Sequence, residues 1–446
     1  MPATAAGRYD VVVVGARCAG SPLATHLAGA GLSVVLVDRV ASVATETAST
    51  HVFQAEGVAC LGRLGVLDRL EGTGAPWISQ ARMRLGDISV TVPWPTRAGD
   101  PGPQLCVRRS LLDPILLERA AGAGVDVRLG TRVTGLVKSD GRVTGVEGES
   151  EGRALTLEAP VVVGADGRSS TMARLVAARR YNVVPNERFA YWGYYEGARW
   201  EPPATLLTQR WDDEFVISCP ADSGLYLVIV YPPLARLDRF RKDADASFDA
   251  AVSACAPVAE IVAEGRRVGR LSTMASYEGF FRDSAGPGWV LVGDAGHFKD
   301  PAPGQGISDA LRQAERLSAV IVETAGSPDA DRDRALRQWW RERDRDEAEM
   351  HWFAADMGGA GRVPLVLSEI VKARIAAPGG AAQMFDVFNH RVPPSKVLTA
   401  PRLATATARL LAAGRHPRKV VLSEVGDILR QEIRRQLRNR RPTYAV

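Results

Sequence analysis

One segment near the N-terminus limits the folds open to this chain more than any other. Residues 11–14 are an unbroken valine run, which a glycine-rich turn at 15–20 joins to an alanine- and leucine-rich stretch and then to a second apolar run at 33–37. Consecutive β-branched residues are typical of a strand buried on both faces, as in a parallel sheet, and the stretch between the runs is typical of a crossover helix. The pattern predicts an α/β fold.

The turn between that strand and that helix has the chemistry of a dinucleotide site. Backbone amides there can approach a pyrophosphate, and the helix dipole favours the negative charge. Asp38 ends the second run, where a carboxylate can accept hydrogen bonds from ribose hydroxyls. Arg17 replaces the usual second glycine and is expected to contact the phosphates, with an ordinary tight turn as the alternative. The candidate contacts are Gly15, Arg17, Cys18, Ala19, Gly20, Asp38 and Arg39.

Composition excludes several classes of protein. Of 446 residues, 46% are hydrophobic and 24% are charged, which excludes a disordered chain and a collagen-like repeat. Five cysteines without a C-x-x-C pair fit neither a disulfide framework nor a zinc cluster, and the six histidines lack ligand spacing, so no metal is expected. We expect a cytoplasmic protein, because the sequence has neither a signal-peptide pattern nor an apolar run of ~18 residues.

The net charge of +5 rests on arginine, since six of the 56 basic residues are lysines. Because these residues are spread along the chain, no nucleic-acid partner is expected. One dense cluster lies near the C-terminus, where a solvated helix end and an anionic partner both remain open. It comprises Arg434, Arg435, Arg438, Arg440 and Arg441.

Two later segments repeat the arrangement of a buried strand that ends in a glycine turn with a carboxylate. The valine run at 161–163 leads to Asp166, and the apolar run at 289–292 leads to Asp294 and then to a glycine pair around Gln305. Doubly wound sheets bind ligands at the C-terminal ends of their strands. Both carboxylates are therefore candidates for the same ligand as the first motif.

In this order and spacing, the three motifs resemble those of the group A flavoprotein monooxygenases, the p-hydroxybenzoate hydroxylase-like family, as an atypical subgroup with a G-A-R-C-A-G turn. The resemblance covers roughly residues 9–320 and implies a Rossmann-like FAD-binding domain of the glutathione-reductase type. Ser308 and Gln313 depart from the asparagine and the acid that the family usually has at these positions.

The resemblance also implies roles for individual residues toward FAD. Asp294 would hold a ribityl hydroxyl, and Asp166 would lie on the pyrophosphate side. The backbone amides of the glycine pair around Gln305 would face the O2 and N1 edge of the flavin. This implies roles for Gly304, Gln305, Gly306 and Ile307. Arg109 would contact FAD, with Arg108 as the competing choice, since an arginine at a helix start can present a bidentate fork to phosphate.

Aromatic residues concentrate in the segment 181–232, which is expected to form a sheet that covers the substrate. Strand alternation places Tyr191 and Tyr195 on one face and Trp192 and Tyr194 on the other. One face is expected to line a cavity, and packing of a second core is the alternative. The expected parts are an FAD-binding domain at 1–180 and 283–330, a mostly antiparallel substrate sheet at 181–282, and a helical C-terminal cap at 331–446.

The resemblance implies an FAD-dependent monooxygenase of secondary metabolism, with NAD(P)H as electron source and a flavin hydroperoxide as oxidant. Its substrate is expected to be a large aromatic or polyketide-like molecule, and a homodimer and a separate flavin reductase are conceivable partners. The candidate catalytic residues are His51, Pro301 and Gly304. The alternatives are a reductase of prenyl chains, similar to geranylgeranyl reductases, and a flavoprotein without turnover. A halogenase is disfavoured, because the first lysine is Lys138.

Overall fold

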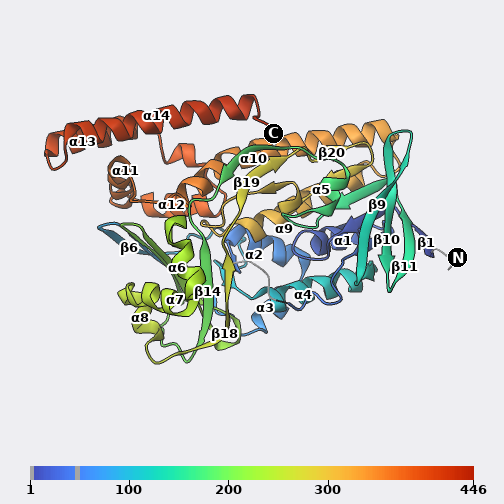
Figure 1. Ribbon diagram of the computed structural model, residues 1–446, viewed down its shortest axis with the longest axis horizontal. Helices are drawn as coiled ribbons and strands as arrows, with labels where there is room; N and C mark the ends of the chain where they lie inside the picture. The colour runs from blue at the N-terminus through green and yellow to red at the C-terminus, as the bar shows by residue number, and fades with distance from the viewer. Residues whose placement is uncertain (1–4, 46–50, 446) are drawn as a thin grey trace.

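A six-stranded sheet forms the centre of the computed structural model, which describes residues 5–45 and 51–445 (Figure 1). All of its neighbouring strands run parallel except at the β20 edge. The four predicted buried strands are confirmed, and their residues alternate between two separate hydrophobic clusters on the two faces of the sheet. In spatial order the strands are β20 (Ala285–Gly286), β21 (Trp289–Leu291), β12 (Val161–Gly164), β2 (Val11–Val14), β3 (Val34–Val37) and β8 (Asp126–Arg128).

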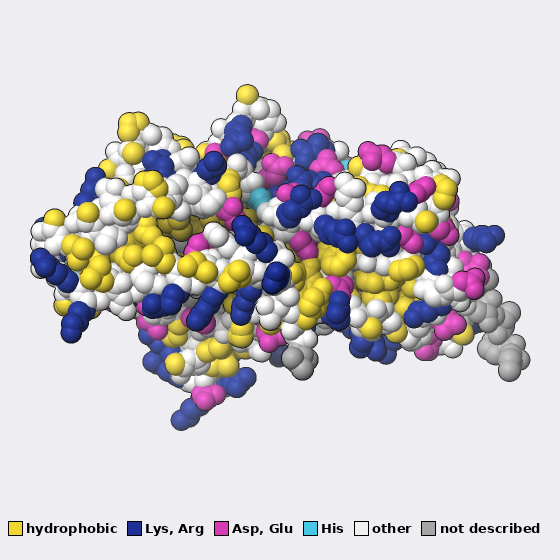
Figure 2. Space-filling view, turned by 90° about the horizontal axis from the view of Figure 1, so that it is seen from above, with side chains coloured by type: hydrophobic (Ala, Val, Ile, Leu, Met, Phe, Trp, Pro, Cys, Tyr) yellow, Lys and Arg dark blue, Asp and Glu magenta, His cyan; other side chains and the backbone are white. Residues whose placement is uncertain are grey.

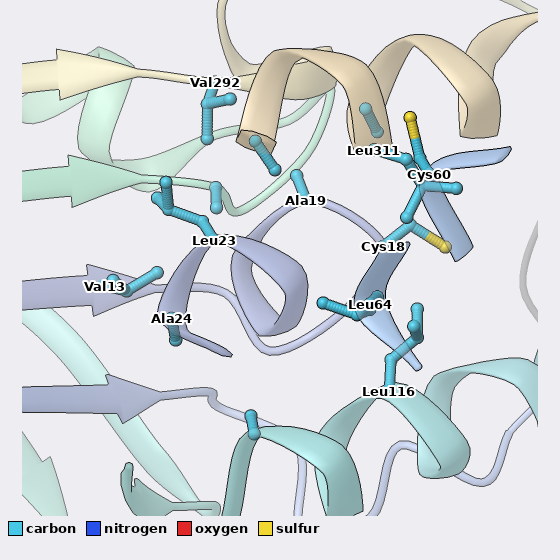
Figure 3. Close-up of a cluster of buried hydrophobic side chains, with 14 of the residues drawn as sticks. Val13, Cys18, Ala19, Leu23, Ala24, Cys60, Leu64, Leu116, Val292 and Leu311 are labelled. Carbon is cyan, nitrogen blue, oxygen red and sulfur yellow. The ribbon is translucent and has the colours of Figure 1, made fainter. Parts of the chain in front are cut away.

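Helices cover one face of this sheet. The predicted crossover helix is α1 (Gly20–Gly29), which packs against α9 (Gly306–Glu323) and α4 (Arg109–Gly122). Figure 3 shows Leu23 and Ala24 of α1 beside the sheet residue Val13, with Leu311 of α9 and Leu116 of α4 on either side. The shorter helices α2 (Ala55–Leu64) and α3 (Leu67–Glu71) lie on this face, whereas α5 (Thr171–Leu175) packs on the other face of the sheet.

A four-stranded sheet covers the other face. Three of its strands form an antiparallel meander, and the N-terminal strand joins the edge of the meander in the parallel direction. Val133, Val146 and Leu157 of this sheet pack on residues of the central strands. In order the strands are β1 (Ala5–Arg8), β11 (Arg153–Glu158), β10 (Arg142–Ser150) and β9 (Thr131–Ser139).

The aromatic segment belongs to a seven-stranded sheet, which is antiparallel except where β15 pairs with β5. Its strands are β18 (Arg266–Met274), β14 (Ala190–Glu196), β17 (Tyr226–Val230), β16 (Glu214–Pro220), β15 (Thr205–Trp211), β5 (Gln80–Leu85) and β6 (Ile88–Pro93). The hairpin of β5 and β6 lies within the segment 1–180 that the sequence assigned to the FAD domain. That segment therefore also contributes two strands to the seven-stranded sheet.

The predicted alternation in β14 is confirmed. Tyr191 and Tyr195 pack beneath three short helices, whereas Trp192 and Tyr194 belong to the cluster on the opposite face. The short helices are α6 (Leu237–Lys242), α7 (Ala244–Ser253) and α8 (Ala256–Val262). Two small sheets complete the architecture: β13 (Arg180–Pro185), β19 (Glu278–Arg282) and β22 (His297–Phe298), and the pair β4 (Val52–Phe53) and β7 (Leu105–Cys106).

The C-terminal region is helical, as predicted. The long α10 (Asp329–Met357) packs along α9, and α11 (Leu365–Ile375) and α12 (Gly380–Phe388) reach the Trp192 face of the seven-stranded sheet. The last two helices, α13 (Ala400–Ala413) and α14 (Arg418–Arg440), form the outermost layer (Figure 1). Among the described residues, no helix combines the length and the apolar character that crossing a bilayer requires.

Candidate active site

A cavity of about 800 Å³ lies where the three large sheets meet. The ends of β2, β12 and β21 contribute its wall on the side of the central sheet, β9 contributes a second wall, and β14 and β18 contribute a third. Residues from all three predicted glycine motifs line it. The structure thus brings together segments that are separated by more than a hundred residues in the sequence.

The first motif opens helix α1 onto this cavity. Ala19 is the N-cap of α1 and no side chain caps the helix, so amides of its first turn remain available to a ligand. Gly15 has φ +109°, and a Cβ there would lie 2.4 Å from the carbonyl oxygen of Ala165. Gly20 does not line the cavity; a Cβ on it would lie 1.8 Å from the carbonyl oxygen of Gly15. Gly20 therefore acts through packing of the turn, whereas Gly15, Cys18 and Ala19 line the cavity.

Asp38 stands at the end of β3 and lines the cavity beside the exposed Arg39. Its Oδ2 accepts a hydrogen bond from the amide of Ala16 at 2.8 Å, and its Oδ1 accepts one from the amide of Val40 at 3.1 Å. Because each carboxylate oxygen has two lone pairs, the side chain is held in place and still has acceptor capacity for a ligand hydroxyl. This arrangement fits the predicted ribose contact.

Arg17 and Arg109 share the buried carboxylate of Asp113. Arg17 donates from its NH1 to Oδ2 at 2.7 Å, and Arg109 forms a two-point contact through its Nε and NH2, each at 2.8 Å. Both arginines line the cavity. Arg108, the competing choice, is paired instead with Asp222 and does not line the cavity. Sequence reasoning missed Asp113, because only the fold brings Arg17 onto it.

The two motif carboxylates differ in what they bind. Asp166 accepts hydrogen bonds from the Ser170 hydroxyl and from the amides of Thr171 and Met172, so its oxygens are engaged in capping α5. Within the described residues, the Asp294 carboxylate accepts no hydrogen bond from the protein, and it lines the cavity. Burial raises the pKa of Asp294 to about 6, against the opposing effect of Arg109. Asp294 is thus free to bind a ligand hydroxyl, whereas Asp166 mainly shapes the wall.

The third motif places the start of α9 at the cavity. Gly306 and Ile307 line it, with Pro301 and Gly304 just before them, and no side chain caps this helix. A Cβ added at Gly306 would meet no atom within 4 Å, which leaves room against the backbone for a flat group. This open backbone, the uncapped helix ends and the free Asp294 together fit FAD.

Other residues of the third motif hold the loop rather than face the cavity. Gln305 does not line the cavity; its side-chain amide donates to the carbonyl oxygens of Val387 and Phe388 at 3.2 and 3.0 Å. The two departures from the family pattern also have structural partners. Gln313 accepts a hydrogen bond from the amide of Gly293 at 3.1 Å, and the Ser308 hydroxyl accepts one from the amide of Gln54 at 3.2 Å.

His51 is buried and is not among the residues that line the cavity. Its backbone has φ 62°, and its ring stacks on Tyr194 with 5.9 Å between centroids. Burial lowers the pKa of His51 to about 3, so the ring is neutral at physiological pH. Its neighbour Val52 does line the cavity.

Sequence reasoning missed several lining residues. Lys299 is buried and forms ion pairs with Asp309 at 2.7 Å and with Glu347 at 3.0 Å. No motif marked the residues at the end near the seven-stranded sheet, because their strands pair with distant partners. They are Trp192, Tyr231, Met274, Phe298 and Asp300. Alternation placed Trp192 and Tyr194 on one face but did not show which face lines the cavity. On β9, Arg132 and Thr134 were missed for the same reason.

Comparisons with known proteins agree with this site. Menaquinone reductase of Mycolicibacterium smegmatis is 30% identical over 72% of this chain and 78% of its own length. Digeranylgeranylglycerophospholipid reductase of Methanocella arvoryzae is 27% identical over 70% of this chain and 77% of its own. A flavoprotein/dehydrogenase from Cytophaga hutchinsonii shares the fold, with a TM-score of 0.76 at 17% identity and coverage of 91% of this chain and 100% of that one.

A family model described as an FAD binding domain matches residues 8–338, which include all three motifs and the cavity they line. The match and the menaquinone reductase likeness agree with the fit of the open glycine backbone to a flavin. This chain therefore belongs to the FAD-binding domain family of flavoproteins.

Proposed function

We propose that this protein is an FAD-dependent monooxygenase that oxygenates a large aromatic or polyketide-like molecule, with NAD(P)H as electron source. One observation carries the proposal: a single cavity joins the FAD motifs to an aromatic and apolar wall. Trp192, Tyr231, Met274 and Phe298 line this substrate end. Such a lining favours a flat, apolar compound over a small charged acid.

Different residues would bind FAD at one end of the cavity and the substrate at the other. The α1 turn would hold the pyrophosphate, Asp38 the ribose and Asp294 a ribityl hydroxyl. The uncapped N-terminus of the 18-residue α9 would stabilise negative charge on the ring system. FAD, when bound, supplies the redox chemistry. Trp192 and Met274 would exclude water from the reacting centre, which strengthens the electrostatic effect of α9.

A second candidate is a reductase of a prenyl or other unsaturated chain. The specific support is the likeness to relatives named as reductases of menaquinone and of digeranylgeranylglycerophospholipid. The same cavity would serve, since an isoprenoid chain is also bulky and apolar. The two candidates differ in their need for oxygen.

The discriminating experiment uses the purified, FAD-loaded protein with NADH or NADPH. Polycyclic phenols and prenylated quinones are offered in air and under strict anaerobiosis, while oxygen uptake and product mass are recorded. A monooxygenase gives a product heavier by one oxygen atom, and only in air. A product heavier by two hydrogen atoms, formed equally well without oxygen, overturns the proposal in favour of the reductase. Colourless protein that releases no FAD on denaturation contradicts both.

A further inference from the structure

The substrate end of the cavity contains polar groups that the FAD motifs do not use. Asp300 lines the cavity and is 8% exposed. Its Oδ2 accepts a hydrogen bond from the Tyr277 hydroxyl at 2.9 Å, and its Oδ1 accepts one from the amide of Ala302, also at 2.9 Å. Gly358, at the end of α10, packs against the carboxyl group, where a Cβ would lie 2.1 Å from Oδ2. The carboxyl group is thus fixed on one side and faces the cavity on the other.

Tyr231 provides a second polar group at this end. It follows β17, is fully buried and lines the cavity, and its ring packs on Phe215 with 5.4 Å between centroids. Among the described residues, its hydroxyl has no hydrogen-bond partner. A buried hydroxyl without a partner costs about 1–3 kcal/mol, so its presence in a cavity wall points to a ligand group.

Asp300 and Tyr231 line the same cavity, and Tyr277, which donates to Asp300, belongs to the same buried cluster as Tyr231. Burial first, and then the charge of Asp300, raise the pKa of Tyr231, and the same two causes raise the pKa of Tyr277. Burial raises the pKa of Asp300 to about 7; Arg188 opposes this effect and Glu187 adds to it. Burial lowers the pKa of Arg210 on β15 to about 10, and the charge of Asp300 opposes this effect. A donor hydroxyl and a carboxyl acceptor therefore line the same cavity, among apolar side chains.

We propose that Tyr231 and Asp300 form a recognition site for a hydroxyl group on an aromatic ring of the substrate, with Tyr277 as the residue that positions Asp300. The Tyr231 hydroxyl donates to the oxygen of the substrate hydroxyl, which in turn donates to Asp300. The inference rests on the proposed function, because it names the substrate class of the same cavity: hydroxylated, polycyclic and otherwise apolar. An electron-rich phenolic ring is also the kind of ring that oxygenation favours.

The test measures binding of 1-naphthol and of naphthalene, which lacks the hydroxyl, to the FAD-loaded protein by isothermal titration calorimetry. Tyr231→Phe and Asp300→Asn are each expected to weaken 1-naphthol binding about fivefold to tenfold, as loss of one hydrogen bond predicts, and to leave naphthalene binding unchanged. The control is Tyr226→Phe, a buried tyrosine of β17 that bonds to Ser218 and does not line the cavity. Equal losses for both ligands, or an effect of the control, overturn the proposal.

A pH series separates recognition from a structural effect. Because the carboxylate form of Asp300 is the better acceptor, 1-naphthol binding to the unaltered protein should strengthen from about pH 6 to about pH 8. Asp300→Asn should remove that dependence. The outcome is independent of the reaction type: a protein that reduces prenyl chains yet selects 1-naphthol through Tyr231 contradicts the proposed function only. A monooxygenase that binds both ligands alike contradicts this inference only.

A separate observation concerns the outer face of α14. Leu422, Leu429, Ile433 and Leu437 are 48–59% exposed and recur along one side of this 23-residue helix. An adjacent side packs on α11 and α13 through Val421, Val425 and Ile428. Figure 2, which looks onto the molecule from above, shows hydrophobic side chains beside Lys and Arg in the half that contains α13 and α14. We call the four exposed residues the α14 stripe.

Basic residues outnumber acidic residues around the α14 stripe. At 3.6 residues per turn, Lys419, Arg430 and Arg434 border it on one side and Arg440 extends its end. Of the three acids of the helix, Asp427 pairs with Arg430 and Glu424 pairs with Arg362, while Glu432 lies on the other border of the stripe. Two copies packed stripe to stripe would bring like charges together. We infer that the α14 stripe docks on an anionic lipid surface, where basic side chains meet headgroups and leucines enter the acyl boundary.

Vesicle sedimentation tests this second inference with the intact, FAD-loaded protein. Phosphatidylcholine vesicles with about 30% phosphatidylglycerol should capture it, and pure phosphatidylcholine vesicles should not. The triple variant L429S/I433S/L437S should lose at least tenfold in vesicle affinity, while Leu398→Ser, an exposed leucine before α13, should not. A dimer that the triple variant abolishes, without vesicle binding by the unaltered protein, assigns the stripe to a second copy and overturns the inference.

Discussion

Aspartates at the strand ends show how environment decides what a residue does. Asp38, Asp166 and Asp294 each follow a buried strand, and the sequence predicts all three as ligands. Only the structure shows that Asp166 is engaged by α5 whereas Asp294 is not. Asp300 could not be predicted, because it looks like a spacer before Pro301 until the fold brings Tyr277 against it and places it in the cavity wall.

The Gly306→Leu substitution tests the FAD fit at a single residue. Because a Cβ at Gly306 meets no protein atom within 4 Å, the variant should fold normally and lose most of its FAD, since the leucine fills the space against the α9 backbone. The measurement is the flavin absorbance of the purified protein beside its circular dichroism. Gly29→Leu is the control, because a Cβ at Gly29 on α1 also meets nothing and Gly29 does not line the cavity. Full FAD retention by Gly306→Leu would contradict the assignment.

Asp300 should make stability depend on pH. Its pKa rises from the ordinary 3.8 to about 7 on folding because of burial, so the native state binds more protons than the unfolded state between these values. The free energy of unfolding should therefore fall as pH rises through this window, relative to Asp300→Asn, by ~4 kcal/mol in total, and level off above it. Urea denaturation of both proteins across the range checks this. Parallel curves would show that Asp300 ionises normally.

Elements were predictable where a pattern is local and continuous. The valine runs identify β2 and β12 because strands buried on both faces need no alternation, and the alternation in β14 identifies which aromatics share a face of the sheet. The pairing of β5 with β15 was not predictable, since it joins Gln80 to Thr205 across the sequence. The packing of the C-terminal helices on the seven-stranded sheet was not predictable either, because helix periodicity does not show which element a helix packs against.

The contact between β2 and α1 should depend on Gly20. Its Cβ would lie 1.8 Å from the carbonyl oxygen of Gly15, a backbone atom that cannot move without shifting the turn. Gly20→Ala should cost about 3 kcal/mol or more of unfolding free energy. Gly29→Ala, on the same helix in open space, should be neutral or should stabilise by about 0.5 kcal/mol. Chemical denaturation compares the two, and similar values would show that the turn relaxes easily.

Helix α10 is joined to the cavity wall by buried charges. Glu347, 1% exposed, binds Lys299 at 3.0 Å and also pairs with Arg312 of α9. Glu347→Ala should cost about 3–5 kcal/mol, because it leaves two buried cations without this partner. Asp346→Ala breaks an exposed pair with Arg316 one residue away and should cost less than about 1 kcal/mol. Equal losses in a denaturation series would mean that the buried group reorganises.

At the scale of the whole molecule, the cavity is the place where three sheets and α9 meet, so its occupant should hold them together. A ligand that binds only the native state stabilises it by about 2.7 kcal/mol at a hundredfold excess over its dissociation constant. When FAD is removed, the segments that line the cavity should unfold locally before the rest of the chain unfolds. Removal of FAD should therefore affect parts of the molecule unequally.

Hydrogen exchange of the FAD-loaded and FAD-depleted protein measures this inequality. Exchange should accelerate at 15–20, 131–134 and 304–307, which belong to three different elements of the cavity wall. It should not change in α13 and α14, which lie in the outermost layer away from the central sheet (Figure 1). Acceleration confined to one wall would show that the sheets associate without FAD. Acceleration everywhere would mean that the cofactor is needed for the fold as a whole, because the walls then could not open separately.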